Sequence, residues 1–166
     1  MMSEVSMAID DFDVSEKWKE RFEIFEKCGA RDGYKTYSKN FKSLESREVF
    51  SIYFNIWAFI FWPYYYFVKK MWHKGFVLLG LPFLVGNIAT ILEFLIKKPI
   101  PNIIPMGGGV AVCAVMANYD YYRKTVCSEK MWKTFSIFSN LLIAILFAII
   151  NFAVRVIIVS LMEARI

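Results

Sequence analysis

Long runs without a charged residue dominate the pattern of hydrophobic and polar positions in this chain. Residues 49–68, 99–119 and 134–154 form three runs of at least 20 residues, and residues 75–92 form a fourth run of 18. A helix of about 20 apolar residues crosses the hydrocarbon core of a bilayer. The pattern therefore predicts an all-α fold, a polytopic membrane helical bundle of three or four transmembrane or re-entrant helices. Their approximate ranges are residues 49–68, 75–96, 103–122 and 134–162.

Residues 1–48 precede the first run and differ from the rest, because they hold 11 of the 15 acidic residues. A helix is predicted over about residues 14–28, ended by Gly29. Its apolar positions recur at helical spacing and share one face: Val14, Trp18, Phe22 and Phe25. We expect residues 1–48 to form a short cytoplasmic, amphipathic, helical appendage to a transmembrane domain over residues 49–162.

A second amphipathic helix is predicted over about residues 34–47. Its aromatic and apolar face contains Tyr34, Tyr37, Phe41 and Leu44, and the remaining positions contain Lys35, Lys39, Lys42 and Arg47. An aromatic face opposite a basic face is typical of a helix that lies in a membrane interface. The alternative is an ordinary amphipathic helix that packs on its neighbour.

Pro63 interrupts the first charge-free run, because proline removes a backbone hydrogen bond and kinks or breaks a helix. If all four runs cross the membrane, seven basic residues flank each side, and the positive-inside rule gives no orientation. If the first run turns back at Pro63 as a re-entrant hairpin, eleven basic residues lie on one side and three on the other. The hairpin topology has three crossings and a cytoplasmic N-terminus. A proline-kinked full crossing is the alternative.

The composition agrees with a membrane protein and argues against a nucleic-acid-binding protein. Hydrophobic residues make up 57% of the chain and aromatic residues 18%, whereas soluble domains are about 45–50% apolar. Residues 49–166 hold 11 basic and 4 acidic residues, spread over short loops. Charge of this kind suits anionic lipid, so we expect the bilayer and no nucleic acid among the partners.

One segment carries a family resemblance. Residues 54–66 read FNIWAFIFWPYYY, residues 70–75 read KMWHKG, and residues 117–122 read ANYDYY. Over about residues 50–125 the chain resembles the small bacterial inner-membrane proteins grouped as domain-of-unknown-function family 2628. The residues that match the family's first motif are Phe54, Asn55, Ala58, Phe59, Pro63, Met71, Trp72, Lys74 and Gly75. The chain departs from the family at Trp62, where glycine is usual, and at Lys69-Lys70, where a pair ending in glycine is common. The resemblance implies a bacterial inner-membrane location and no known reaction.

Polar residues within the apolar runs are the candidate functional residues, because ionisable groups at membrane depth are costly and often functional. They are Asn55, Asn87, Glu93, Asn118, Asp120, Asn151 and Arg155. The asparagines are expected to form hydrogen bonds between helices, with a polar substrate path as the alternative. Arg155 either extends to the headgroups or pairs with the carboxylate of Glu93 or Asp120.

The sequence predicts no catalytic, metal or cofactor site. There is a single histidine, no paired carboxylates, and no metal-ligand spacing among the three cysteines. We therefore expect a non-enzymatic, multi-pass protein of the bacterial inner membrane that acts through a protein partner or as a homo-oligomer, in an accessory, inhibitory or immunity-type role. An oligomeric channel or transporter component is the alternative.

Overall fold

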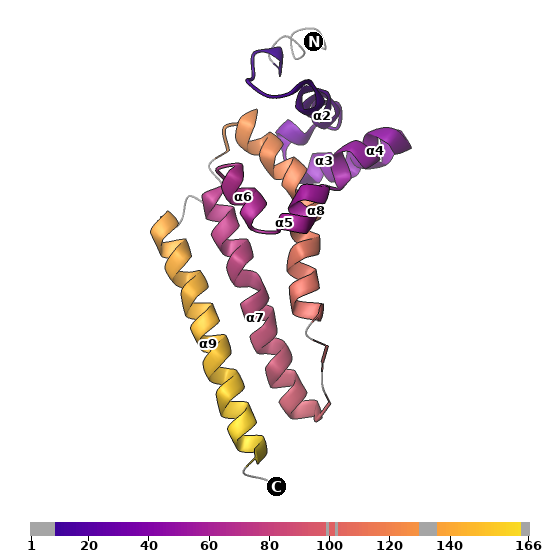
Figure 1. Ribbon diagram of the computed structural model, residues 1–166. Helices are drawn as coiled ribbons and strands as arrows, with labels where there is room; N and C mark the ends of the chain where they lie inside the picture. The colour runs from indigo at the N-terminus through magenta and orange to yellow at the C-terminus, as the bar shows by residue number, and fades with distance from the viewer. Residues whose placement is uncertain (1–8, 99, 102, 130–135, 164–166) are drawn as a thin grey trace. The chain divides into compact units, whose positions relative to one another are not determined.

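Helices make up the regular structure of the part of the chain that the computed structural model describes, residues 9–98, 100–101, 103–129 and 136–163, and no strand occurs in it (Figure 1). The α-helices are α2 (Glu16–Lys27), α3 (Tyr34–Asn40), α4 (Ser46–Tyr53), α5 (Ile56–Phe61), α6 (Tyr64–Val68), α7 (Trp72–Ile96), α8 (Ile103–Thr125) and α9 (Ile137–Glu163). Two 3-10 turns lie at Ala30–Asp32 and Phe41–Ser43. The predicted all-α fold is confirmed.

The chain forms two compact units. The first contains Met1–Ile56 and Ala114–Met131, and the second contains Trp57–Cys113 and Trp132–Ile166. Each unit therefore combines two separate stretches of sequence, and α8 contributes to both. The division of the chain at residue 48 stays a prediction.

The first unit has an aromatic core. The Phe25 and Tyr122 rings are stacked with their centroids 5.0 Å apart, and the Tyr37 and Tyr119 centroids are 4.9 Å apart. Phe22 and Phe25 on α2 are fully buried, which confirms the apolar face of this helix. Gly29 follows α2 with a φ of 68°, as expected of a glycine that ends a helix. Aromatic pairs of this geometry each contribute about 0.5–1.5 kcal/mol beyond the area they bury.

The predicted single helix over residues 34–47 is wrong. The structure has α3, a 3-10 turn and the beginning of α4 in this region, separated at Leu44 and Glu45, whose backbones are extended. The new helix begins there because Glu48 turns back and its carboxylate accepts a 2.9 Å hydrogen bond from the Glu45 backbone N–H. Such a bond satisfies one of the amides that a helix N-terminus leaves without a partner.

The charge-free run over residues 49–68 is not one helix. The break expected at Pro63 is present, with α5 ending at Phe61 and α6 beginning at Tyr64. A second break at Phe54 and Asn55 was not predicted. It arises because the Asn55 backbone N–H donates a 2.9 Å hydrogen bond to the Ala114 carbonyl, across the first unit, in place of a helical bond.

In the second unit α7 and α9 lie side by side and run in the same direction (Figure 1). The contacts between the two helices occur in the same order along both of them. The side chains of His73 and Asn140 meet near the two starts, with Asn140 Nδ2 3.1 Å from His73 Nδ1. Asn151 Nδ2 donates a 3.0 Å hydrogen bond to Asn87 Oδ1 further along. The pair is therefore parallel.

Glycine permits the close approach of α7 and α9. A Cβ atom at Gly80 would lie 3.3 Å from the Ala144 Cα atom, and one at Gly86 would lie 3.1 Å from Asn151 Nδ2. Small residues at such contacts are common where membrane helices pack.

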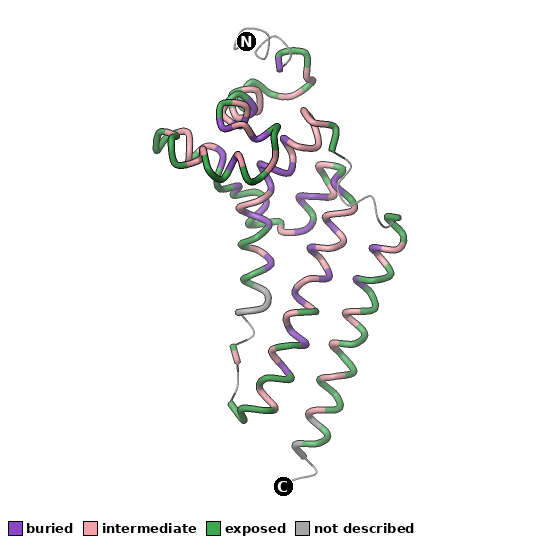
Figure 2. The backbone as a smooth tube through the Cα atoms, turned by 180° about the vertical axis from the view of Figure 1, so that it is seen from behind, coloured by how far each residue is buried: buried purple, intermediate pink, exposed green. Residues whose placement is uncertain are grey.

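Among the described residues, two helices are long and apolar enough to cross a membrane, over Trp72–Ile96 and Ile137–Ile158. Most of the second stays exposed within the protein, as the green colour of α9 in Figure 2 shows. An unburied helix rich in Leu, Ile, Val and Phe favours a lipid environment. Both helices are compatible with membrane association.

Candidate functional site

A buried pair of asparagines joins the chain's two motif segments within the first unit. Asn55 Nδ2 donates a 2.7 Å hydrogen bond to Asn118 Oδ1, and Asn118 Nδ2 donates a 3.0 Å hydrogen bond to the Ile52 carbonyl. Asn118 is fully buried and Asn55 nearly so. Each amide therefore has hydrogen-bond partners in an apolar surrounding, which a buried polar group requires. This arrangement is structural, and it holds the end of α4 against α8.

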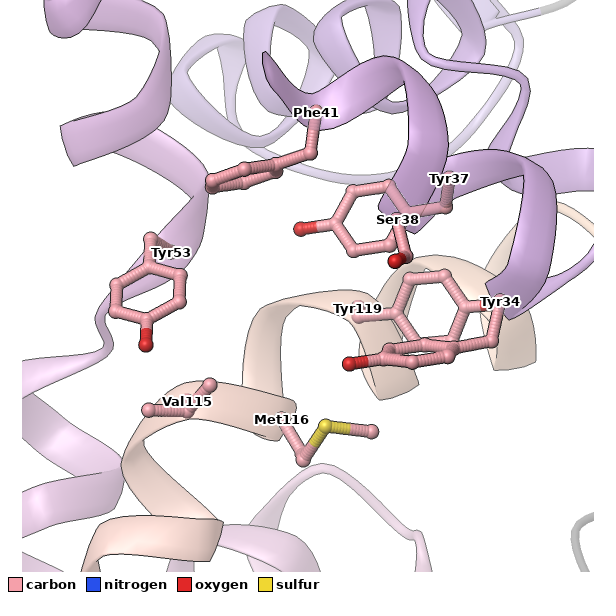
Figure 3. Close-up of a pocket in the computed structure, with 8 residues that line it drawn as sticks. All are labelled: Tyr34, Tyr37, Ser38, Phe41, Tyr53, Val115, Met116 and Tyr119. Atoms are coloured by element: carbon pink, nitrogen blue, oxygen red, sulfur yellow. The ribbon is translucent and has the colours of Figure 1, made fainter.

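Beside this pair lies a pocket of about 120 Å³, which we call the tyrosine pocket (Figure 3). Its lining residues come from α3, the following 3-10 turn, α4 and α8: Tyr34, Tyr37, Ser38, Phe41, Tyr53, Val115, Met116 and Tyr119. Figure 3 shows the Tyr37 hydroxyl pointing into the opening, with Tyr53 on one side and Met116 below. For comparison, a protein cavity of about 150 Å³ holds a benzene ring. The pocket thus has the size of one small apolar or aromatic group.

The tyrosine pocket is uncharged. None of its eight lining side chains is acidic or basic. Burial raises the pKa of Tyr37 far above its ordinary value, so its hydroxyl stays protonated and can both donate and accept. Tyr34 and Tyr53 are about half exposed, at 55% and 47%, whereas Tyr37 and Tyr119 are 8% exposed. The pocket therefore has a buried aromatic floor and an exposed aromatic rim.

In the second unit, hydrogen-bonded amide side chains connect α7 and α9, and we call this row the amide seam. Asn87 and Asn151 are hydrogen-bonded to each other as described above, and Asn151 Nδ2 also lies 3.4 Å from the Phe83 carbonyl. The Thr90 hydroxyl donates to the Gly86 carbonyl at 2.9 Å. A cavity of about 220 Å³ lies nearby, lined by Phe76, Val77, Gly80, Asn140, Ile143, Ala144 and Phe147. The expected hydrogen bonding of asparagines between helices is thus seen for the pairs Asn55–Asn118 and Asn87–Asn151.

The three ionisable candidates lie in different surroundings. The Glu93 carboxylate accepts a 2.6 Å hydrogen bond from the Ile100 backbone N–H, which ties the end of α7 to the segment after it. Asp120 is buried in α8, at 2% exposed, and Arg155 lies on the exposed face of α9. The pairing of Arg155 with either carboxylate, and the extension of Arg155 to the headgroups, both stay predictions.

The family-motif residues have packing roles. Ala58, Pro63, Met71 and Gly75 are buried, whereas Phe54, Phe59 and Trp72 remain partly exposed. Gly75 lies close to the Phe67 ring, because a Cβ atom there would lie 2.5 Å from it and the ring would have to shift. The Met71 backbone N–H donates a 2.8 Å hydrogen bond to the Tyr66 carbonyl. Lys74 lies on the first turn of α7 and is partly buried.

The tyrosine pocket was not predicted from the sequence. Helical periodicity places Tyr34, Tyr37 and Phe41 on one face, but it does not bring Tyr53 and Tyr119 to them. Those residues are distant in sequence, and only the packing of α8 on the N-terminal helices joins them.

Among the described residues, no group of three His, Cys, Asp or Glu side chains could hold a metal ion.

Comparison with known proteins gives a family and relatives of unknown function. The sequence profile of a family described as "Protein of unknown function (DUF2628)" matches residues 11–127. The chain is 31% identical over 127 residues to "Uncharacterized protein YigF" of Salmonella typhimurium (strain LT2), covering 75% of this chain and 94% of the relative. It is 31% identical over 130 residues to "Uncharacterized protein YigF" of Escherichia coli (strain K12), with the same coverage.

No solved structure matches this chain. The family match ends before α9, which begins at Ile137. The tyrosine pocket and the Asn55–Asn118 pair lie within the matched region, and the α9 side of the amide seam lies outside it.

Proposed function

The chain belongs to the DUF2628 family of proteins of unknown function, and from its structure we propose that it is a three-span protein of the bacterial inner membrane. In this proposal α7, α8 and α9 cross the bilayer, and residues 1–48 lie on the cytoplasmic side. The protein acts there by binding another protein and not by catalysing a reaction.

The parallel packing of α7 and α9 supports a third crossing. The contacts His73–Asn140 and Asn87–Asn151 run in the same order along both helices. Two parallel crossings in one chain require that the chain return across the membrane between them. α8 is the helix between them, and its 23 residues span about 35 Å at 1.5 Å per residue. That length is enough for a bilayer core of about 30 Å.

Contacts inside the first unit support a topology in which residues 49–68 do not cross. Arg123, near the end of α8, donates to the Ala30 carbonyl at 3.0 Å and to the Arg31 carbonyl at 2.7 Å. Residues 31 and 123 therefore lie on the same side of the membrane, and the chain between them crosses an even number of times. α7 and α8 account for two crossings. A further crossing over residues 49–68 would make the number odd.

The distribution of charge orients this topology. With three crossings, eleven basic residues flank the membrane on the side of residues 1–48, and three flank it on the other side. Cytoplasmic loops carry the excess of lysine and arginine in inner-membrane proteins. Residues 1–48 are accordingly cytoplasmic in this proposal, and the C-terminus lies outside.

The tyrosine pocket carries the proposal of a protein partner. Tyrosine is enriched where binding energy concentrates in interfaces, and such sites receive an aromatic or aliphatic side chain of the partner. The rim residues Tyr34 and Tyr53 are half exposed, and the pocket holds one group of that size. We expect one apolar side chain of a cytoplasmic or membrane-bound protein to bind there.

Photo-crosslinking in cells tests the partner hypothesis. A benzophenone amino acid at Tyr34 or Tyr53 is expected to give adducts with the same protein. Filling the pocket with Ser38→Trp should abolish these adducts. Ser43→Trp, on the exposed 3-10 turn and outside the pocket lining, should leave them unchanged. Adducts that persist in Ser38→Trp, or no adducts at either position, would reject the pocket as the binding site.

The alternative of an oligomeric channel or transporter component makes a different prediction. It would use the polar residues of the apolar helices, including Asn87, Glu93 and Arg155, to line a path. Purified protein in liposomes would then conduct ions, and the flux would be lost in Glu93→Gln or Arg155→Leu. Proteoliposomes with no flux above protein-free controls would disfavour this alternative.

A further inference from the structure

The short helices α5 and α6 differ from the rest of the second unit in length. α5 has six residues and α6 has five, which correspond to about 9 Å and about 7.5 Å. Neither can cross a bilayer core of about 30 Å. Nevertheless both belong to a segment without a single charged residue, residues 49–68. The segment is too apolar for water and its helices are too short for a crossing.

The outer face of this segment is exposed and aromatic. Trp57 is 60% exposed, Ile60 is 59% exposed and Tyr64 is 70% exposed. The Trp57 and Phe61 rings are stacked at 5.9 Å, so they form one continuous apolar surface. Soluble proteins rarely expose contiguous apolar surface of this kind without a partner.

The Trp62 side chain extends from the turn between α5 and α6 toward the middle of α7. A Cβ atom at Gly109 would lie 3.0 Å from the Pro82 side chain and 3.5 Å from the Trp62 indole, so these three residues meet within the second unit. Pro82 is ten residues after Trp72, which corresponds to about 15 Å along α7. The Trp62 indole therefore extends well below the start of α7.

The backbone of the turn satisfies its own hydrogen bonds, as lipid requires. The Tyr65 N–H donates to the Trp62 carbonyl at 3.1 Å, and the Tyr66 N–H donates to the Pro63 carbonyl at 3.0 Å. Pro63 has no N–H to satisfy. The break in the helix thus leaves little unpaired backbone at depth.

The far end of the segment returns to the start of α7. The Phe67 ring is stacked on Trp72 at 5.4 Å and contacts Phe76 at 4.9 Å. Lys69 and Lys70 follow directly and suit anionic headgroups. Both the break at Trp62 and this basic end agree with a segment that enters and leaves by one face.

We propose that residues 55–68 form a re-entrant wedge in the cytoplasmic leaflet, with the exposed face of Trp57, Ile60 and Tyr64 in its acyl chains. The proposal rests on the three crossings proposed above, and it adds the depth and the occupant of this face. We assign lipid as the partner of this exposed face because the face belongs to the second unit. In that unit α7 and α9 are long and apolar enough to cross the bilayer.

Fluorescence quenching with the full-length protein tests the depth. A variant with Cys28→Ala, Cys113→Ala and Cys127→Ser receives a single cysteine at Ile60, labelled with an environment-sensitive dye. The protein is placed in vesicles of phosphatidylethanolamine and phosphatidylglycerol that carry nitroxides near the headgroup or at the end of the acyl chain. We expect greater fractional loss of fluorescence with the shallow nitroxide, and little loss with aqueous iodide. Greater loss with the deep nitroxide, or strong quenching by iodide, would overturn the wedge.

Labelling of single cysteines with an impermeant maleimide tests the return to the same face. Arg47→Cys and Lys70→Cys should react from the same side of the membrane. Ile100→Cys and Ser128→Cys serve as the matched pair for the three crossings and should react from opposite sides. Reaction of positions 47 and 70 from opposite sides would mean that residues 49–68 cross the membrane, and it overturns both the wedge and the three crossings. Reaction of these positions from the same side, together with strong iodide quenching at position 60, overturns the wedge alone, so the two failures are distinguishable. Reaction of positions 100 and 128 from the same side overturns the crossing by α8.

Discussion

Asn55 and Asn118, 63 positions apart, are joined by a 2.7 Å side-chain hydrogen bond in the core of the first unit. Each belongs to a segment in which the sequence resembles the family. The Asn55 backbone N–H is also bound, to the Ala114 carbonyl at 2.9 Å. One residue therefore ends α4, begins the turn toward α5, and attaches both to α8.

Replacing Asn118 tests the value of this link. Asn118→Leu leaves the Asn55 amide and the Ile52 carbonyl buried without their partner, and we expect a loss of about 1–3 kcal/mol in the free energy of unfolding. Denaturant unfolding in detergent micelles, followed by circular dichroism, measures it. Lys42→Leu, on the exposed surface, is the control and should change stability by less than about 0.5 kcal/mol. Equal stability of the two variants would contradict the structural role.

The glycines of α7 and α8 offer a matched pair of substitutions. Gly80→Leu is expected to destabilise the protein by about 1–3 kcal/mol, because its side chain would meet the α9 backbone at Ala144. Gly108→Leu should have little effect, because no atom lies within 4 Å of the position of its Cβ. The midpoint of thermal unfolding in nanodiscs compares the two. A smaller loss in Gly80→Leu than in Gly108→Leu would argue against the close packing of α7 on α9.

Lys70→Gly is expected to stabilise the protein. Lys70 has a φ of 56°, in the left-handed region, where a side chain costs roughly 1–2 kcal/mol. Glycine removes this strain but loses more chain entropy on folding, so the net gain should be about 0.5–1 kcal/mol. Lys70→Ala removes the same charge and keeps the strain, so it should give no gain. Thermal unfolding of the wild type, Lys70→Gly and Lys70→Ala at one pH measures these differences in stability. A gain in Lys70→Ala equal to that in Lys70→Gly would reject strain as the cause.

The ion pair between Lys27 and Glu48 predicts a dependence of stability on acid. The Lys27 ammonium donates to Glu48 Oε1 at 2.7 Å, and together with the Glu45 N–H it holds the pKa of the Glu48 carboxyl below its ordinary value. A depressed pKa in the folded state stabilises the protein above the unfolded pKa of about 4.3. This stabilisation is lost as the pH falls through the lower, folded pKa.

Thermal unfolding between about pH 6 and about pH 3 measures this loss, since the window brackets the unfolded pKa of about 4.3. Glu48→Gln should unfold with a shallower dependence on pH, because it has no proton to gain. Lys27→Met removes the partner and should also flatten the curve. The double variant should show no further change, since both substitutions remove one interaction. A pH dependence in Glu48→Gln as steep as in the wild type would show that other carboxyl groups cause it.

At two positions this chain has another residue where the family usually has glycine, and the structure gives a physical reason for the family's preference. Trp62 has a φ of 21° and Lys70 a φ of 56°, both in the region that favours glycine. The sequence located these positions only by resemblance to the family. The structure explains why glycine suits them, because each lies at the end of a short helix where the chain reverses.

The sequence by itself determined the all-α fold, the apolar helices after residue 70, and the aromatic face of α2, because these depend on periodicity and on the length of charge-free runs. Only the tertiary structure decided the break at Asn55, because it depends on a hydrogen bond to a distant segment. The break at Leu44 depends instead on the local hydrogen bond between Glu45 and Glu48, which apolar periodicity does not reveal. The Asn55 break in particular needs the Ala114 carbonyl, 59 positions away. Tertiary packing also decided the tyrosine pocket and the parallel pairing of α7 with α9. Hydrophobic periodicity identifies which face of a helix is apolar, but the partner of that face depends on packing between distant segments.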